Sequence, residues 1–547
     1  MDEEEKLECA AREIITYLVN HPKFEKKKIT QLKNQIIKKY HFGKTPKNSR
    51  ILEYVTEDEM ELIGHLLRRR STRTISGVTV VAVMTKPFPC PGKCIYCPGE
   101  QSQPGEKAAQ SYTGQEPAAR RSIMFEYDPY LQTKHRLLDQ QAIGHNVDKV
   151  ELIIMGGTFL STPIEYQRSF VKNCIDAMNN CYQPDFNSDM RSESLEEAKR
   201  EAETAKLRFV GLTIETRPDY CKIPHVNSML NYGATRVEIG IQTTRTEILS
   251  GLQRGHSIED SINAIKFSKD GGLKVNAHIM PNLPGSDLSS ELQDFNNLFA
   301  NQCFRPDMLK IYPTLVIKGT KLYEMWKQGD YESYSLEDTV KIIAEMKASI
   351  PKYVRIQRIQ RDIPAFLIVD GVKKSNLRQL VQNYMKKHDM TCNCIRCREH
   401  GFFNKVQRRK GINKKPDFAE FQIERLDYDA SDGKEIFLSF ENDNALLGYL
   451  RLRRPSQDEF RPEINSEDTM IVREIRVVGE LVPKDHDPRP TQLQHRGFGS
   501  RLLESAEKIA KEEFDAKKMV VISGIGVREY FYRQGYSLDG VYVAKPL

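Results

Sequence analysis

The sequence predicts an α/β protein in which a complete or partial barrel of parallel strands precedes a smaller α/β domain. From Gly77 onward, short apolar segments alternate with helical stretches, which is the rhythm of a repeated βα unit. From Phe418 the pattern changes to adjacent antiparallel strands and then a long helix. We therefore expect a helical basic segment at residues 1–72, a barrel domain at 73–350, a basic linker at 351–415 and a second α/β domain at 416–547.

The N-terminal segment is predicted to be helical, because AAREIITYLVNH and ITQLKNQIIKKY carry apolar residues three and four positions apart. It is also basic: Lys23 to Arg50 holds ten Lys or Arg and one acid, Glu25. A second basic run lies between Arg396 and Lys415. Such runs are either solvated helix faces or sites that bind a polyanion by releasing counterions. Two of them favour a nucleic-acid partner, with candidate contacts Lys26, Lys27, Lys28, Lys33, Lys38, Lys39, Arg408, Arg409 and Lys410.

Six apolar segments are the predicted barrel strands: GVTVVAVMT, VELIIMGG, RFVGLTIET, RVEIGIQT, KVNAHIMP and MLKIYPTLV. In barrels of this kind the reactive groups lie at the carboxyl ends of the strands. The cysteine-rich loop after the first segment, the Gly156–Gly157 pair, Glu215 and Gln242 all fall at such ends. These positions are the candidate site.

Composition excludes several classes of protein. Hydrophobic residues make up 39% and charged residues 29%, as in ordinary globular proteins. We find no apolar run of about 18 residues, so no membrane span is expected. The acidic start MDEEEKLE lacks the features of a secretion signal. Eleven cysteines without such a signal indicate the reducing cytoplasm and metal chemistry.

The loop PCPGKCIYCPG places Cys90, Cys94 and Cys97 in a C-x3-C-x2-C pattern. Disulfide frameworks use even numbers of cysteines, usually in small secreted domains. Three thiols on one tight loop instead suit three corners of an iron–sulfur cluster, with one iron left open to an outside ligand. The alternative is a zinc knuckle with a remote fourth ligand.

A second group, Cys392, Cys394 and Cys397, forms a C-x-C-x-x-C pattern in the linker. A tetrahedral zinc site needs a fourth ligand, for which Cys303 and His400 are the candidates. We favour Cys303, because it would tie the linker to the barrel. A second iron–sulfur cluster is the alternative.

The segment QHRGFG, residues 494–499, stands where a strand passes into a helix. Glycines at such a turn let backbone N–H groups approach phosphate oxygens at the positive end of the helix. The segment therefore predicts a phosphate-binding loop.

The first cysteine loop resembles the radical S-adenosylmethionine (SAM) signature in its spacing and in the aromatic residue before the last cysteine. The resemblance implies a [4Fe–4S] cluster on Cys90, Cys94 and Cys97 whose open iron binds SAM. The strand-end residues that it assigns to SAM are Gly156, Gly157, Glu215 and Gln242.

The last domain resembles the GNAT acetyltransferases, because MIVREIRVVG precedes QHRGFG, which precedes VVISG and REYFYRQGY. In that family the loop holds the coenzyme A (CoA) pyrophosphate and the strand pairs with the pantetheine arm. The residues so assigned to acetyl-CoA are Glu474, Ile475, Arg476, Val477, Gln494, Gly497, Phe498, Gly499 and Ser500. Many GNAT enzymes carry a thiolate-protonating tyrosine where this chain has Phe531. Either a neighbour such as Tyr530 substitutes, or the site only holds CoA.

The pairing of these domains, together with QSYTGQEP, TIETRPDYC, LKIYPTLVI and QRDIP, resembles the family of Elongator catalytic subunits from about residue 70 to the C-terminus. The family implies that a SAM-derived 5′-deoxyadenosyl radical removes a hydrogen from the acetyl methyl of acetyl-CoA. The methyl carbon then bonds to C5 of uridine 34 in the tRNA anticodon stem-loop, and thioester hydrolysis leaves 5-carboxymethyluridine. The short cysteine spacing and the C-x-C-x-x-C cluster match archaeal or bacterial members.

The same resemblance assigns Lys149 to acetyl-CoA and places Lys310 and Tyr312 in a shared catalytic cavity, although core packing explains Tyr312 equally well. It implies an electron donor, and it is compatible with Elongator-type partner subunits or a homodimer. Two other functions stay open. One is a protein lysine acetyltransferase whose cluster only stabilises the fold, and the other is an RNA-binding scaffold. The intact cysteine triplet and glycine loop argue against the scaffold.

Overall fold

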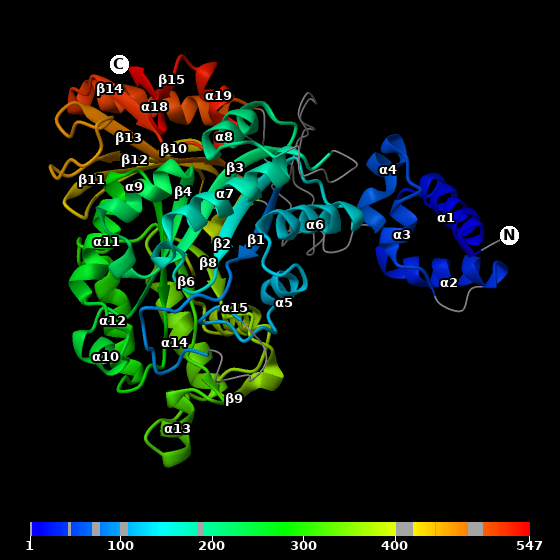
Figure 1. Ribbon diagram of the computed structural model, residues 1–547, viewed down its shortest axis with the longest axis horizontal. Coiled ribbons are helices and arrows are strands. Elements are labelled where there is room, and N and C mark those ends of the chain that lie inside the picture. The colour runs from blue at the N-terminus through cyan, green and yellow to red at the C-terminus, as the bar shows by residue number, and fades with distance from the viewer. Residues whose placement is uncertain are drawn as a thin grey trace.

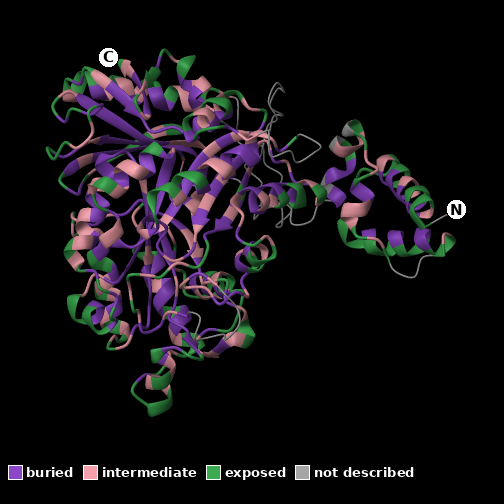
Figure 2. Ribbon diagram, in the orientation of Figure 1, coloured by how far each residue is buried: buried purple, intermediate pink, exposed green. Residues whose placement is uncertain are grey.

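The computed structural model describes residues 3–41, 45–67, 77–98, 108–182, 191–400, 420–442, 445–479 and 496–547. Within them the chain forms a helical N-terminal unit, a half-barrel of parallel strands and a mixed sheet that packs against helix α18 (Figure 1). Buried residues concentrate on the strands of both sheets (Figure 2). No helix among the described residues is long and apolar enough to cross a membrane.

The barrel sheet is parallel throughout and has the strand order β1-β2-β3-β4-β5-β6-β8. Its strands are β1 (Val78–Met84), β2 (Lys149–Met155), β3 (Arg208–Thr216), β4 (Ala234–Gln242), β5 (Lys274–Ile279), β6 (Met308–Ile311) and β8 (Arg355–Ile359). The prediction of a partial parallel barrel is confirmed. Strand β8 lies beyond residue 350, where the barrel pattern was expected to end. Its sequence, RIQRI, has no apolar run, and the buried Arg355 is paired with Glu399.

Helices pack around the half-barrel, and their buried residues recur every three or four positions. In α7 (Ile164–Asn179), for example, Phe170, Cys174 and Met178 join the barrel core. The other helices of this region are α5 (Pro117–Met124), α6 (Pro129–Ala142), α8 (Leu195–Thr204), α9 (Ile223–Asn231), α10 (Thr246–Gly251), α11 (Ile258–Asp270), α12 (Leu288–Ala300), α13 (Lys321–Gln328), α14 (Leu336–Ala348), α15 (Leu377–Lys387) and α16 (Ile395–Arg398). A short ribbon of β7 (Val316–Ile317) and β9 (Ile368–Asp370) accompanies them.

The N-terminal unit stands apart from the barrel and meets it beside α6 (Figure 1). It consists of α1 (Glu3–Asn20), the 3₁₀ turn η1 (Lys26–Lys28), α2 (Ile29–Lys39), α3 (Asn48–Leu52) and α4 (Glu57–Leu67). Ile14, Ile36 and Ile63 belong to its own apolar core. The prediction of a phosphate contact at Lys33 is wrong: this side chain is buried and donates to Asn48 Oδ1 at 2.8 Å.

The C-terminal sheet has the order β10-β11-β12-β13-β14-β16-β15 and is antiparallel except between β13 and β14. Its elements are β10 (Gln422–Ala430), β11 (Gly433–Glu441), β12 (Leu446–Arg454), β13 (Thr469–Val477), α18 (Phe498–Phe514), β14 (Lys518–Val521), α19 (Arg528–Tyr532), β15 (Ser537–Asp539) and β16 (Tyr542–Pro546). Strand β14 pairs with residues 469–472 of β13, while residues 474–477 pair only with β12 in the described part of the sheet. The sheet therefore opens between β13 and β14.

A buried network of charges joins the C-terminal sheet to the amino ends of the barrel strands. Arg473 donates to both oxygens of Asp307, at 2.6 and 2.8 Å, and to Glu435 at 2.8 Å. Arg453 donates to Asp270 at 2.6 Å and to Glu435 at 3.0 Å. All five side chains are buried, and Asp270 and Asp307 come from the barrel region. Their mutual satisfaction fixes the two sheets against each other.

Candidate active site

The cysteine loop lies at the carboxyl edge of the barrel, held by backbone hydrogen bonds from two directions. Ile95 N donates to Leu252 O at 3.1 Å, and Leu322 N donates to Ile95 O at 2.9 Å. The loop faces a cavity with about 1180 Å³ of empty space, part of it open to solvent. The predicted residues that line it are Cys90, Cys94, Cys97, Gly157, Glu215, Gln242, Lys310 and Tyr312.

The sulfurs of these three cysteines are more widely spaced than the ligands around one zinc ion. A tetrahedral zinc with Zn–S bonds of about 2.3 Å brings its sulfurs to roughly 4 Å from one another. Among the described residues, Cys90, Cys94 and Cys97 do not form a group whose sulfurs all lie within 4.8 Å of one another. The wider spacing suits a multi-iron cluster, whose thiolate ligands bind different irons.

Polar side chains surround the cysteine sulfurs. Gln110 Nε2 donates to Cys97 Sγ at 3.3 Å, and Ser111 Oγ lies 3.1 Å from the same sulfur. Arg254 Nη1 lies 3.5 Å from Cys94 Sγ and donates to Tyr96 OH at 3.0 Å. Hydrogen bonds to ligand sulfurs are a recurrent feature of iron–sulfur sites, so these residues fit such a cluster.

Two strand ends carry backbone that side chains rarely adopt. Gly156 and Gly157 follow β2 with φ of 112° and 57°, and a Cβ on Gly156 would lie 2.8 Å from Thr85 Oγ1. Gln242 ends β4 with φ of 69°, and its buried Oε1 has no hydrogen-bond partner among the described residues. Strain of this kind in a non-glycine residue, together with an unpartnered polar atom beside the cavity, is typical of a ligand-binding position.

Lys310 is the cation of a buried cluster of charges in the cavity wall. Its Nζ contacts Glu238 and lies 3.2 Å from Glu215 Oε1, while His278 Nε2 is 3.0 Å from Glu238 Oε2. Burial opposes the charge of Lys310, yet Glu238 raises the pKa of this lysine above its ordinary value. Ligand atoms of Glu215, Glu238 and His278 lie within 4.8 Å of one another, and the Lys310 ammonium contacts both carboxylates there. Tyr312 packs with its ring 5.4 Å from that of His278.

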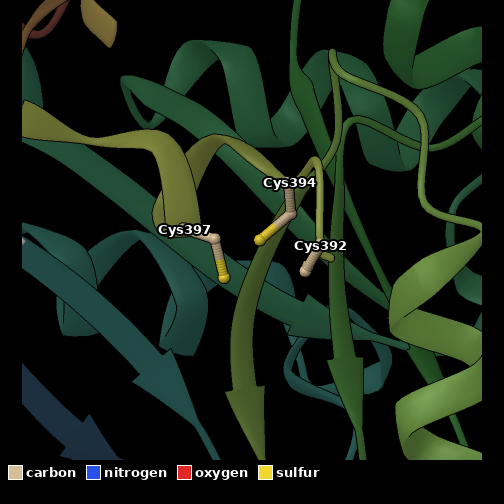
Figure 3. Close-up of side chains that lie close together, drawn as sticks. All are labelled: Cys392, Cys394 and Cys397. Atoms are coloured by element: carbon tan, nitrogen blue, oxygen red, sulfur yellow. The ribbon is translucent and has the colours of Figure 1, made fainter. Parts of the chain in front are cut away.

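The three linker cysteines lie close together (Figure 3). The sulfurs of Cys392, Cys394 and Cys397 lie within 4.8 Å of one another. Lys347 Nζ donates to Cys392 Sγ at 3.2 Å and to Cys397 Sγ at 3.6 Å. Cys303 does not belong to this group: its carbonyl oxygen accepts from Ser431 Oγ at 3.3 Å, in the turn between β10 and β11. The expectation that Cys303 completes the site is therefore not met, and His400 is not in the group either.

In the C-terminal domain, the predicted loop residues Gly497, Phe498, Gly499 and Ser500 form the start of α18, and Gln494 lies outside the described residues. Gly497 caps the helix with φ of 77°. The Tyr530 hydroxyl lies 3.5 Å from Ser500 Oγ, and burial raises its pKa.

Phe531 is 2% exposed and packs in the apolar core of the C-terminal domain. The burial of Phe531 in the core leaves the neighbouring Tyr530 as the candidate for the tyrosine that Phe531 replaces. Arg476 and Val477 follow Glu474 and Ile475 on the open part of β13, where the Glu474 carboxylate accepts from Arg451 Nε at 3.0 Å.

Other predicted residues lie away from the cavity. Lys149 begins β2 at the amino end of the barrel, and burial lowers its pKa. The basic residues Arg408, Arg409 and Lys410 lie outside the described residues.

Several residues of the cavity were not predicted from the sequence. Glu238 and Gly240 precede Gln242 at two-residue steps on β4, so strand alternation could have placed them on its inner face. Arg217 and Arg254 stand in loops, and no local pattern marks them.

Family models match three parts of the chain: the Radical SAM superfamily at residues 89–295, the Radical_SAM C-terminal domain at 306–387 and the ELP3 N-terminal domain at 7–75. With the parallel half-barrel and the cysteine loop at its carboxyl edge, these matches define a radical SAM protein.

Similarity to whole proteins narrows the family. A tRNA uridine(34) acetyltransferase from Methanocaldococcus jannaschii is 50% identical over 552 residues, covering 100% of this chain and 99% of the relative. Elongator complex protein 3 from Homo sapiens is 41% identical, covering 95% of this chain and 93% of the relative. The solved structure of archaeal Methanocaldococcus infernus Elp3 with an N-terminus deletion (1-46) is 48% identical with a TM-score of 0.74, covering 87% of this chain and 100% of that one. The chain belongs to this family of tRNA uridine(34) acetyltransferases and Elongator complex proteins 3.

Proposed function

We propose that this chain forms 5-carboxymethyluridine at uridine 34 of tRNA from acetyl-CoA and SAM. The relatives named tRNA uridine(34) acetyltransferase support the tRNA and acetyl-CoA parts of this function. The observation that carries the radical part is the shared cavity of the three loop cysteines, Glu215 and Gln242 at the carboxyl edge of the barrel. A C–H bond of an acetyl methyl resists polar side chains, so its activation calls for a cofactor.

In the barrel, Cys90, Cys94 and Cys97 would hold a [4Fe–4S] cluster, and Gly157, Glu215 and Gln242 would hold SAM beside it. When bound, the cluster and SAM would supply the radical chemistry that activates a C–H bond of the acetyl methyl. Lys310 lies within hydrogen-bond reach of Glu215 and Glu238. Burial opposes the charge of Glu238, yet the neighbouring Lys310 lowers the pKa of this carboxyl well below its ordinary value. Tyr312 and His278 close the same wall with their rings.

Residues 416–547 would act as a GNAT-type domain that holds acetyl-CoA. The start of α18 offers backbone N–H groups to the pyrophosphate, and no described atom lies within 4 Å of a Cβ placed on Gly497. The open edge of β13 at residues 474–477 would pair with the pantetheine arm. Tyr530, whose hydroxyl lies beside the same helix end, would give a proton to the CoA thiolate, and Lys149 would contact the acetyl-CoA from the barrel side.

The remaining parts would serve the tRNA and the architecture. The N-terminal unit, residues 1–72, would contact phosphates of the anticodon stem-loop, and the linker, residues 351–415, would hold a zinc ion on its three cysteines. An electron donor is required, and Elongator-type subunits or a second copy are the expected protein partners. A reducing cytoplasm suits a chain whose eleven cysteines are all free.

Deuterium on the acetyl methyl tests this function. In anaerobic reactions with a reductant, SAM and tRNA, the label should appear in 5′-deoxyadenosine, and 5-carboxymethyluridine should appear in the tRNA. Cys94→Ala should abolish both together with the iron. Gly497→Glu should abolish both while keeping the iron, because a carboxylate would repel the pyrophosphate. An acetyl group transferred to protein with all three deuteriums, and unlabelled 5′-deoxyadenosine, would contradict the proposal.

A further inference from the structure

Arg254 is a buried cation that touches the cysteine loop directly. Its guanidinium lies 3.5 Å from Cys94 Sγ and donates to Tyr96 OH at 3.0 Å. The residue is 8% exposed and follows the segment whose carbonyls at Leu252 and Gln253 accept from the N–H groups of Ile95 and Lys93. The backbone carbonyls of Leu252 and Gln253 and the side chain of Arg254 therefore all contact the cysteine loop.

Glycine 240 makes room for that guanidinium. A Cβ on Gly240 would lie 2.5 Å from Arg254 Nη2, so any side chain at this point of β4 would displace the arginine. Gly240 has no positive φ, so its backbone conformation alone does not require glycine. The inner face of β4 is thus shaped to hold Arg254 against the cysteine loop.

In the part of the chain that the structure describes, the charge of Arg254 has no acidic partner. Among the described residues, no carboxylate forms an ion pair with it, and its Nε has no hydrogen-bond partner. Arg217, the other buried arginine of the cavity, is paired with both oxygens of Asp219 at 2.8 and 2.9 Å. A buried guanidinium without a counter-charge is costly, by several kcal/mol. The groups that its guanidinium faces are the Cys94 sulfur and the Tyr96 phenol, so the missing anion belongs at the cysteines.

We infer that Arg254 is a positioning residue for the iron–sulfur cluster, holding the Cys94 thiolate and supplying the counter-charge that makes the cluster easier to reduce. The inference rests on the proposed [4Fe–4S] cluster. Net charge and hydrogen bonds to the sulfurs set the reduction potential of such clusters. A fixed positive charge stabilises the reduced form, which carries one more electron, so its loss makes the potential more negative.

The test is the midpoint potential of the cluster in the anaerobic full-length protein, followed by electron paramagnetic resonance during a redox titration. Arg254→Met removes the charge and the donor and should make reduction at least tenfold less favourable, a shift of about 59 mV to more negative potential. Arg254→Gln keeps a donor and should shift less. Arg358→Gln is the matched control: this arginine lines the same cavity, pairs with Asp362 and has a side chain 39% exposed, so the potential should not move.

The outcomes separate this inference from the proposed function. A wild-type protein that binds no iron–sulfur cluster would contradict both the proposed function and the role of Arg254. A cluster with full iron and an unchanged potential in Arg254→Met would overturn the role of Arg254 alone. If Met and Gln variants both lose iron at unchanged circular dichroism while Arg254→Lys keeps it, the charge is required and the inference stands. Loss of iron from the Lys variant as well would overturn it, because the site would then need the shape of arginine and not its charge.

Discussion

Glu291 is a carboxyl group that the barrel wall keeps largely out of water. It lies on α12, is 6% exposed, and accepts from Ser286 Oγ at 2.9 Å and from the Asn282 backbone. Burial raises its pKa to about 7, and the nearby Asp294 acts in the same direction. The folded state therefore binds a proton more tightly than the unfolded chain. Its contribution to stability is full below the ordinary carboxyl pKa of about 4.3 and is lost as the pH rises through 7.

Glu291→Gln removes this titration while keeping an oxygen that accepts both hydrogen bonds. The variant should match the wild type near pH 4.5 and exceed it at pH 8, by up to about 3 kcal/mol in the free energy of unfolding. Urea denaturation between pH 5 and 8 measures the difference. Glu424→Gln, on an exposed position of β10, is the control and should leave the profile unchanged. A wild type whose stability does not fall over this range would contradict the assignment.

At the scale of elements, the linker hooks onto the barrel through its cysteine turn. Cys394 caps α16, Ile395 N donates to Val354 O at 2.9 Å just before β8, and Lys347 reaches the sulfurs from α14. Lys347 stands beside the sulfurs where a fourth ligand was expected. A zinc ion with three cysteines would need a further ligand, which Lys347 could provide only after losing its proton.

Cys394→Ser should lose one zinc per chain and lower the melting temperature, because the turn that holds linker and barrel together loses its ion. Metal analysis beside thermal denaturation checks both effects. The iron content should stay at the wild-type level, since the cysteine loop of the barrel lies elsewhere. Cys303→Ser is the matched control and should keep its zinc. Loss of iron from Cys394→Ser would mean that the linker cysteines hold a second cluster.

The elements differ in how far the sequence could predict them. Strands β1 to β6 carry apolar runs, and their shared carboxyl edge brings Glu215, Gln242 and Lys310 to one cavity. Strand β8 could not be predicted, because Arg355 is buried by a partner, Glu399, that lies 44 residues away in the chain. The role of Arg254 could not be predicted either, because its place against the cysteine loop depends on the space left by Gly240, which only the folded structure reveals.

At the scale of the whole molecule, the N-terminal unit stands beside the barrel and carries exposed lysines. Lys27 and Lys28 pair with Glu25 at 3.0 and 3.3 Å, with side chains 80% and 53% exposed. Lys33 is buried and donates to Asn48 instead. Its burial lowers the pKa of its ammonium group. The two kinds of lysine on one unit allow structural and electrostatic effects to be separated.

Replacing Lys26, Lys27, Lys28 and Lys38 with glutamine should weaken tRNA binding and flatten its dependence on salt. Each lost phosphate contact lowers the slope of log affinity against log salt by about 0.7 to 0.9. Filter binding between 50 and 200 mM salt (about the range over which such contacts matter) measures it. The charge-matched control replaces four exposed lysines of α14, α15 and α18 with glutamine: Lys341, Lys386, Lys508 and Lys511. If the slope of log affinity against log salt is the same in all variants, these lysines do not contact tRNA phosphates and are only a solvated surface.

The buried charges between the barrel and the C-terminal sheet make the two halves inseparable. Asp307 and Asp270 come from one half, and the Arg473 and Arg453 that neutralise them come from the other. If the two halves were separated, each would keep ionised groups on a surface that is buried in the intact protein. This would cost about 3–5 kcal/mol for each broken pair. Exchanging one half for a foreign domain would leave these charges without partners unless the same residues were replaced as well. The barrel and the C-terminal sheet therefore depend on each other for stability.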